Sequence, residues 1–435
     1  MGLNNKLREV SFWIIDFLKS SKIKKQYKDI VYVLENYTDE KSNSKREAYL
    51  QKVLKHAKAT VPYYKNKTVD NFKDFPVIDK NVVRNNFEDF KSDSYQGKKI
   101  YPAYTSGSTG TPFRVFHNKE KKIRNTADTL YFAQKGGYTI GQKLYYLRHW
   151  DQYNKKSVLG TFMKNIVMHP VSELTDKDIW NLIEKMKADP EPKSILGYAS
   201  ALANICNYMV NTNAPKVDAN VRSIIAMSEH LSPNVKEQLH HYFGVEGLSR
   251  YSNVENGIIA QQFPGSNTFH INWASYFVEI LEIETDVPVK SGNPGRIVVT
   301  DLFNYSMPLI RYDTGDIGVM KDNDPFNEAP YLEHVEGRKM DMIYNTSGEL
   351  ITSYVTYHLL KYPKIKQFQF IQENKNTYLF ILNVYKGFDL EQQIIEEFKA
   401  HLGADAVIKV EYANDIPLLQ SGKRKLVVNK MFPHQ

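Results

Sequence analysis

A loop rich in glycine and hydroxyl side chains, residues 105–110, reads Thr-Ser-Gly-Ser-Thr-Gly. Backbone N–H groups in such a loop, with the N-terminus of a helix predicted over 120–137 beside them, would suit a phosphate group. The loop is not a Walker loop, because no Gly-Lys-Ser/Thr follows, and the dinucleotide pattern Gly-x-Gly-x-x-Gly is absent. A solvated turn of the same composition is the open alternative.

Charged residues recur at four turns further along the chain. The stretch YSNVENG (251–257) places Glu255 at a strand end, and RYDTGD (311–316) places two carboxylates around a Thr-Gly turn. EGRKMD (336–341) contributes Arg338, and PLLQSGKRK (417–425) carries Lys423 on a glycine turn. Each stretch alone is typical of a surface turn, but four in this order after the loop indicate more than chance.

The elements that must position these residues follow from the apolar pattern. Residues 1–100 are mainly helical, with apolar spacing near 3.6 in YLQKVLKHA (49–57). From about residue 100 the pattern alternates, with strands at 193–198, 222–227, 246–252 and 295–302 and helices at 201–210 and 234–243. Ser232-Pro233 predicts the start of the latter helix and Gly244 its end. This rhythm predicts a parallel or mixed sheet with helices on its faces.

The pattern changes after residue 341. A helix at 355–362, strands at 365–373, 377–385 and 406–412, and a helix at 389–403 form a small α+β unit. The predicted fold is therefore α/β, with a large N-terminal domain of mixed sheets and flanking helices (1–338) and a small α+β C-terminal domain (339–435).

Composition and charge narrow the function classes. The chain has 435 residues, of which 42% are hydrophobic and 24% charged, as in globular proteins. Its net charge of +8 suits anionic ligands, nucleic acid or an acidic membrane surface without choosing among them. We expect no nucleic-acid partner, because the lysines are scattered and no basic arm, RNP motif or zinc finger occurs. Cys206 is the only cysteine, which excludes a disulfide framework and favours a cytoplasmic location.

The N-terminal segment contains a short apolar run over residues 10–18. The run includes Asp16 and is too short to span a bilayer, and no small-residue cleavage site follows it. Four lysines come next, at Lys19, Lys22, Lys24 and Lys25. A helix lying on the inner membrane surface and a helix packed on the protein's own core both stay open.

The motif set as a whole resembles the adenylate-forming ligases, which include acyl-CoA synthetases, luciferases and the adenylation domains of peptide synthetases. Within them it is most similar to the branch of phenylacetate–CoA ligase and the related capsular polysaccharide biosynthesis proteins. LQKVLKHAKATVPYYK (50–65), FPVIDKNVVRNNFEDF (75–90) and ILGYASAL (195–202) carry this branch resemblance. The resemblance covers nearly the whole chain.

The resemblance implies a binding site for ATP and Mg²⁺. The loop residues Thr105, Ser106, Gly107, Ser108, Thr109 and Gly110 would hold the phosphates that leave, and Glu255 would bind Mg²⁺. The remaining nucleotide contacts would come from Tyr251 and Ser252 at the adenine, Asp316 and Arg338 at the ribose, and Ser228 and Glu229 beside adenine and substrate. Lys423 would contact the substrate carboxylate and the α-phosphate.

Other positions match the resemblance less closely. The expected substrate-facing residues are His149, Tyr198, Met227 and Asn253. The hinge between the domains is expected at Met340 or Asp341. Many relatives have a lysine directly after the proline of the loop, whereas Phe113 and then Arg114 follow Pro112 here, so the source of that positive charge is open.

The chemistry implied by the resemblance fits these residue types. A carboxylate attacks the α-phosphorus of ATP, and Lys423 and Mg²⁺ offset the repulsion between the two anions. The C-terminal domain would then rotate, and the acyl group would pass to coenzyme A or to an amine or hydroxyl of a cell-surface polysaccharide precursor. The partners would thus be a small carboxylic acid and an acyl acceptor. The alternative is a non-catalytic nucleotide-binding protein with a structural or regulatory role in polysaccharide assembly.

Overall fold

The structure is a computed structural model, and it divides the chain into two compact units. Unit 1 contains residues 1–141 and 250–335, and unit 2 contains residues 142–249 and 336–435. The described residues are 2–69, 71–105, 113–150, 155–171, 174–323, 328–338, 343–349, 351, 359, 362, 364–417 and 426–431. The mixed α/β architecture, with a separate small C-terminal sheet, confirms the predicted fold class.

Helices dominate the first hundred residues of unit 1, as predicted. They are α1 (Leu3–Leu18), α2 (Lys22–Glu35), α3 (Glu40–Thr60), α4 (Pro62–Lys65) and α5 (Lys80–Asn85), with single 3-10 turns at Phe72–Asp74 and Asp93–Tyr95. Helix α3 buries Leu50, Val53, Leu54 and Ala57, which is the face that the 3.6-residue spacing predicts. No helix among the described residues has the length and apolar character needed to cross a membrane.

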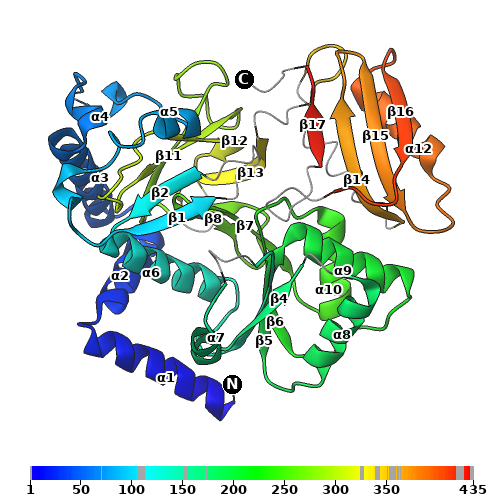
Figure 1. The fold of residues 1–435 in the computed structure, drawn as a ribbon, viewed down its shortest axis with the longest axis horizontal. Coiled ribbons are helices and arrows are strands. Elements are labelled where there is room, and N and C mark those ends of the chain that lie inside the picture. Colours follow the sequence, from blue (N-terminus) through cyan, green and yellow to red (C-terminus); the bar gives the residue numbers. More distant parts are fainter. Residues whose placement is uncertain are drawn as a thin grey trace. The chain divides into compact units, whose positions relative to one another are not determined.

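The strands described around the core of unit 1 follow one another in the order β10-β11-β12-β13-β9-β8-β7. Their bounds are β7 (Gly247–Asn253), β8 (Gly257–Gln262), β9 (Phe269–Ile271), β10 (Tyr276–Leu281), β11 (Pro294–Asp301), β12 (Tyr312–Lys321) and β13 (Tyr331–Arg338). Helices α2 and α6 (Lys119–Lys135) share one apolar core with β8, β10 and β11, and Figure 1 shows the two helices labelled beside each other. Tyr251 of β7 and Ile258 of β8 belong to this core, so the core holds both strands that flank the β7–β8 turn.

The glycine-rich loop joins two paired strands. Strand β1 (Tyr101–Thr105) runs antiparallel to β2 (Phe113–His117), and Thr105 lies opposite Phe113. In the sequence, β2 and then α6 follow the loop. The helix predicted over 120–137 is confirmed as α6, and residues 113–117, whose burial alternates, form a strand that was not predicted.

A short extended segment attaches α5 to the start of β12. The Ile78 N–H donates to the Arg311 carbonyl over 3.0 Å, and the Asp313 N–H donates to the Ile78 carbonyl over 2.7 Å. Asp79 then caps α5 by accepting from the Val82 N–H over 2.8 Å. Lys80, the first residue of α5, is thereby held next to β12.

Unit 2 contains four parallel strands in the order β6-β5-β3-β4. Their bounds are β3 (Lys143–Arg148), β4 (Ile166–Pro170), β5 (Lys193–Tyr198) and β6 (Val221–Met227), and the connecting helices are α7 (Val158–Lys164), α8 (Asp176–Lys187), α9 (Ala199–Asn211) and α10 (Pro233–Phe243). The predicted limits of α10 are confirmed, since Ser232 caps its start and Gly244 ends it with φ +68°. Cys206 of α9 is fully buried in the core beneath these strands.

The C-terminal part forms its own sheet, in the order β16-β15-β14-β17, drawn in orange and red in Figure 1. Its elements are β14 (Ile365–Gln372), β15 (Thr377–Val384), α12 (Glu391–Leu402), β16 (Val407–Tyr412) and β17 (Val427–Asn429). Phe398 of α12 packs on Phe370 and Phe380 of the sheet. The predicted strands and second helix are confirmed, whereas the helix expected at 355–362 falls mostly outside the described residues. The domain boundary between 338 and 339 stays a prediction.

Candidate active site

Glu255 is the most deeply buried acidic residue among the predicted site residues, with 1% of its side chain exposed. It lies in the turn between β7 and β8. Its Oε1 accepts from the Tyr312 hydroxyl over 3.0 Å and lies 2.9 Å from Lys80 Nζ. Its Oε2 is buried and has no hydrogen-bond partner among the residues that the structure describes. A buried carboxylate oxygen without a partner is unfavourable unless a ligand or ion completes it.

Three hydrogen bonds hold the turn that carries Glu255. Asn253 Oδ1 accepts from the Asn256 N–H over 2.8 Å, His117 Nε2 donates to the Glu255 carbonyl over 2.8 Å, and the Tyr276 hydroxyl donates to the Asn256 carbonyl. Gly257 follows with φ +113°, and a Cβ there would meet the Tyr276 hydroxyl at 3.1 Å. Buried hydrogen bonds and the close contact at Gly257 therefore fix the conformation of the turn, and this conformation sets the position of the Glu255 side chain.

A buried ion pair lies behind this turn. Lys121 Nζ is 2.6 Å from Asp301 Oδ2, and both side chains are almost fully buried. Lys121 also donates to the Tyr276 hydroxyl over 3.0 Å. Burial, and then the charge of Lys121, lower the pKa of His117 to about 4. His117 is therefore neutral at pH 7, and its proton is on Nε2, because the carbonyl of Glu255 can only accept.

One face of β12 connects Glu255 to a second carboxylate. Residues 312, 314 and 316 point to the same side of the strand, because side chains alternate. Tyr312 contacts Glu255, while the Tyr251 hydroxyl donates to Asp316 Oδ2 over 2.8 Å and to Thr314 Oγ1 over 3.1 Å. Burial, and then the Asp316 carboxylate, raise the pKa of Tyr251 well above its ordinary value, so the hydroxyl stays a donor.

The other carboxylate of the RYDTGD stretch points away from this face. Asp313 Oδ2 lies 2.7 Å from Arg296 Nη1, and both side chains are largely buried. Asp313 Oδ1 also accepts from the Gly315 N–H over 2.8 Å, in a turn where Gly315 has φ +78°. Asp313 therefore has a structural partner, and Asp316 alone faces Tyr251.

Lys80 is the site residue that the sequence analysis missed. Its ammonium group lies 2.9 Å from Glu255 and 5.9 Å from the ring of Phe113, the residue after the loop's proline. Arg114, the other cation near that position, lies on the opposite side of β2, with its guanidinium over the rings of Phe87 and Phe116. The FPVIDK stretch and the missing lysine after Pro112 were the two signals that could have indicated it.

Unit 2 brings together a second group of predicted residues at the carboxyl ends of its parallel strands. Tyr198 and Met227 are register partners across β5 and β6, and both are buried. His149 comes directly after β3, which pairs with β5. Small molecules commonly bind at this edge of a parallel sheet.

Ser228 and Glu229 follow β6 at the same edge. Ser228 is exposed and has φ +70°. Glu229 Oε2 accepts from the Ser200 N–H over 2.9 Å, so its carboxylate caps the N-terminus of α9.

Several predicted residues are not placed by the structure. Ser106, Gly107, Ser108, Thr109, Gly110, Met340, Asp341 and Lys423 lie outside the described residues. Thr105 ends β1 and Arg338 ends β13, but the side chains of these two residues lie outside the described part. Ser252 is half-buried beside Tyr251 on β7.

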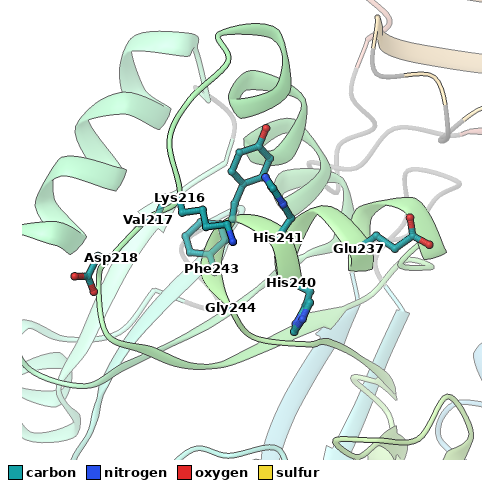
Figure 2. A pocket seen from close by; sticks show the side chains of 9 residues that line it. Lys216, Val217, Asp218, Glu237, His240, His241, Phe243 and Gly244 are labelled. Atoms are coloured by element: carbon teal, nitrogen blue, oxygen red, sulfur yellow. The ribbon is translucent and has the colours of Figure 1, made fainter.

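A surface cavity of about 580 Å³ lies elsewhere in unit 2, at the C-terminal end of α10. Figure 2 shows the side chains that line it, among them Lys216, Glu237, His240 and His241. None of the predicted site residues lines this cavity, so it is not the candidate active site.

The described residues contain no group of three or more His, Cys, Asp or Glu side chains that could hold a metal ion by themselves. Mg²⁺ does not need such a group, because it binds through one or two carboxylates together with substrate phosphates and water. The buried and unpartnered Oε2 of Glu255 fits that role.

Comparison with solved structures identifies the architecture. The structure of 2-hydroxyisobutyryl-CoA ligase in the postadenylation state in complex with 2-HIB-AMP matches with a TM-score of 0.69 and 15% identity, over 88% of this chain and 89% of that chain. This chain has the adenylate-forming ligase fold. ATP-bound MatB from Rhodopseudomonas palustris matches with a TM-score of 0.56 and 14% identity, over 75% of this chain and 66% of that chain.

Sequence relatives of this adenylate-forming fold agree with the branch resemblance. Protein CapK of Staphylococcus aureus is 22% identical over 84% of this chain and 81% of its own length. A phenylacetate-coenzyme A ligase of Pseudomonas putida is 20% identical over 87% of this chain and 83% of its own length. The family model described as the CapK C-terminal domain matches residues 343–430. The chain is therefore a homologue of CapK and phenylacetate-coenzyme A ligases, and the predicted resemblance is confirmed.

Proposed function

We propose that this protein uses ATP and Mg²⁺ to activate a carboxylic acid as an acyl-adenylate and then transfers the acyl group to an acceptor. One observation carries the proposal. In a fold of adenylate-forming ligases, Glu255 presents a buried carboxylate oxygen that has no partner among the described residues, on a turn held by three hydrogen bonds.

Glu255 is the residue that would hold the metal ion, through Oε2. When bound, Mg²⁺ supplies positive charge that stabilises the phosphates during displacement. The protein's own contribution is to keep the carboxylate in place. Tyr312 donates to the other oxygen, and the hydrogen bonds at His117 and Tyr276 prevent the turn from shifting.

Lys80 would supply the positive charge that the loop lacks after Pro112. Its ammonium group lies 2.9 Å from Oε1 of Glu255. It also lies near Phe113, the first residue of β2 after the loop. A lysine side chain has several rotatable bonds, so Lys80 can leave Glu255 for a phosphate oxygen when the metal ion neutralises the carboxylate. We assign it the role of binding the leaving phosphates.

Asp316 would bind the ribose hydroxyls, and Tyr251 orients it. The Tyr251 hydroxyl donates to Oδ2 of Asp316 and so fixes the orientation of the carboxylate. Tyr198 and Met227, at the ends of two parallel strands of unit 2, would line the pocket for the acid.

We also propose that residues 1–338 and 339–435 act as two domains, with a hinge at Met340 or Asp341. Lys423 of the smaller domain would reach the acid carboxylate and the α-phosphate during adenylation. Rotation of this domain would then withdraw Lys423 and open the path for the acceptor.

Two acceptors fit the relatives. The name phenylacetate-coenzyme A ligase points to a thiol, that of coenzyme A. The similarity to CapK points instead to an amine or hydroxyl of a cell-surface polysaccharide precursor. The acid itself is unassigned.

Acid-dependent release of pyrophosphate tests the first step. Purified protein is incubated with Mg²⁺, ATP and panels of aryl, fatty, amino and sugar acids. At least one acid should raise pyrophosphate release, and Glu255→Gln should remove the signal. Mass spectrometry of the product with and without coenzyme A then distinguishes the acceptors.

The second candidate is nucleotide binding without catalysis. The Lys80–Glu255 ion pair favours it, because this pair can neutralise the carboxylate with no metal ion present. Under this alternative, ATP would bind equally well with and without Mg²⁺, and no acid would release pyrophosphate. Titration calorimetry with ATP in Mg²⁺ and in EDTA separates the two candidates.

A further inference from the structure

Helix α1 exposes a continuous apolar stripe. Large apolar side chains recur at spacings of three and four residues, so they share one face of the helix. Each is between 48% and 77% exposed: Leu3, Leu7, Val10, Ile14, Phe17 and Leu18. Exposed apolar side chains are ordinary when scattered, but a stripe along a whole helix marks an interaction surface.

The opposite face of α1 attaches the helix to unit 1, and the two buried residues on this face are polar. Asn5 and Asp16 are only 2% and 3% exposed. Gly141 lies directly against the Asn5 carbonyl, since a Cβ on Gly141 would come within 2.2 Å of that oxygen. Trp13, at the edge of this face, meets Tyr27 of α2 at a ring distance of 6.3 Å. Of the two alternatives, the helix does pack on the protein, but it does so through these residues and leaves most of its apolar run exposed.

Asp16 is the one acidic residue within the apolar run, and its side chain has a structural role. Its two carboxylate oxygens accept from the Ile23 and Lys24 N–H groups, each over 2.9 Å, and so complete the first turn of α2. Its charge is therefore buried between the two helices and absent from the stripe. Figure 1 shows α1 and α2 running in different directions from this junction.

The charges around the stripe are basic. Residues 1–28 contain seven Lys or Arg and two acidic residues. Every exposed charged side chain in the described part of this segment is a lysine: Lys6, Lys19, Lys22, Lys24, Lys25 and Lys28. Lys22, Lys24 and Lys25 lie in the first turn of α2, which contains no acidic residue. Cations at a helix N-terminus are unfavourable for the helix itself, and the Asp16 carboxylate that accepts from the Ile23 and Lys24 N–H groups is the one acidic group described at this turn. The exposed lysine ammonium groups are complementary to an anionic surface.

We infer that α1 and the first turn of α2 form a docking surface for an anionic lipid bilayer. The apolar stripe enters the interfacial region while the lysines contact the headgroups. The helix lies in the membrane plane, because its 16 residues are about 24 Å long, less than the hydrocarbon core. The inference rests on α1 and α2 alone and does not depend on the proposed chemistry.

Binding to vesicles tests the inference with the full-length protein. Co-sedimentation is measured with vesicles of phosphatidylglycerol and phosphatidylcholine and with vesicles of phosphatidylcholine alone. Phe17→Gln should weaken binding roughly tenfold, the effect expected for losing one large apolar side chain from the bilayer. Phe162→Gln on α7 is the matched control, since Phe162 is 71% exposed against 72% for Phe17, and it should change nothing.

The lysines should act only through charge. Lys22→Gln together with Lys25→Gln should weaken binding to the anionic vesicles by roughly fivefold for each lysine and leave the weak binding to neutral vesicles unchanged. Added salt should reduce the difference between the two vesicle types.

Four results would overturn the inference. The first is that the wild-type protein does not sediment with anionic vesicles. The second is that Phe17→Gln and Phe162→Gln weaken binding equally. The third is that Phe17→Gln and Leu7→Gln abolish a dimer detected by analytical ultracentrifugation while vesicle binding is absent, which would make a second copy the occupant. If both α1 variants instead lower the melting temperature strongly, the stripe belongs to the core and the inference fails.

Discussion

Lys80 Nζ and Glu255 Oε1 lie 2.9 Å apart, although 174 residues separate them in the sequence. The hydroxyl of Tyr312 reaches the same oxygen over 3.0 Å, so all described contacts of this carboxylate fall on Oε1. The carboxylate therefore has one oxygen held by the protein and one available to a ligand, and substitutions at the two partners should have separable effects.

Glu255→Gln should leave a folded protein whose acid-dependent pyrophosphate release falls by roughly two orders of magnitude, because an amide is a poor Mg²⁺ ligand. The rate at several Mg²⁺ concentrations is the measurement. Glu333→Gln is the control, since Glu333 pairs with Lys321 in a partly exposed ion pair between β12 and β13. An unchanged rate and Mg²⁺ dependence in Glu255→Gln would refute the metal assignment.

Lys80→Met should lower pyrophosphate release roughly tenfold if Lys80 binds the leaving phosphates, as a charge-assisted hydrogen bond would predict. Lys80→Arg should recover much of the activity, because the charge is kept. Lys321→Met tests for a general effect of removing a lysine that pairs with glutamate. A purely structural role would instead appear as a lower melting temperature in Lys80→Met with no change in the KM for ATP.

Tyr251→Phe removes the hydrogen bond to Asp316 while keeping the ring. Loss of about 1 kcal/mol of orienting interaction predicts a KM for ATP raised roughly fivefold, with kcat almost unchanged. Asp316→Asn should raise the KM further. Equal decreases in kcat would show that Tyr251 acts in the chemical step rather than in nucleotide binding.

The lowered pKa of His117 should make the stability of the folded protein depend on pH. Its pKa is about 4 in the folded protein, against an ordinary value of 6.5, because of burial and then Lys121. Between these values the unfolded chain binds a proton that the folded protein does not, so the free energy of unfolding falls as pH is lowered from 6.5 to 4. The full effect is about 3 kcal/mol. At pH 7 the residue is mostly neutral in both states and contributes little.

Urea unfolding of wild type and His117→Gln at several pH values measures how much the titration of His117 contributes to the free energy of unfolding. Glutamine keeps an N–H donor for the Glu255 carbonyl but does not titrate. Wild type should lose stability relative to the variant as pH falls through this range. Parallel curves would mean that the pKa of His117 is the same in the folded and the unfolded protein.

Lys423→Ala should abolish acid-dependent pyrophosphate release, by roughly two or more orders of magnitude if the lysine stabilises the transition state. ATP should still bind, because Tyr251 and Asp316 remain. Given pre-made acyl-adenylate and the acceptor, the variant should form product at a near-normal rate. Equal loss in the two half-reactions would argue against a rotating C-terminal domain.

Local pattern was enough to predict much of the fold. The capping residues Ser232 and Gly244 and the alternation of strands and helices in unit 2 are properties of neighbouring residues, and the structure confirms them. The strand β2 was missed because its five residues adjoin a glycine-rich loop and a long helix. A strand of five residues gives only a weak alternation of apolar and polar residues, and whether such a segment forms a strand depends on the strand that it pairs with.

The site was predictable only in part. Glu255 and Asp316 stand in recognisable turns, whereas the FPVIDK stretch that ends at Lys80 could indicate a site residue but not that Lys80 meets Glu255. That contact depends on the extended segment at Ile78, which pairs with β12 from a distance of more than 200 residues. The sequence likewise did not indicate that the Asp16 side chain is buried, because its role as an acceptor depends on where the N-terminus of α2 lies.

Cys206 gives the protein an experimental advantage. It is the only cysteine in the sequence, it is fully buried in α9, and burial raises the pKa of its thiol. Maleimide dyes should therefore leave the native wild-type protein unlabelled. A pair of cysteines introduced at exposed sites, one on the parallel-strand region and one on the C-terminal sheet, could be labelled with a donor and an acceptor fluorophore without background. Single-molecule energy transfer would then report the distance between these two regions at each stage of turnover.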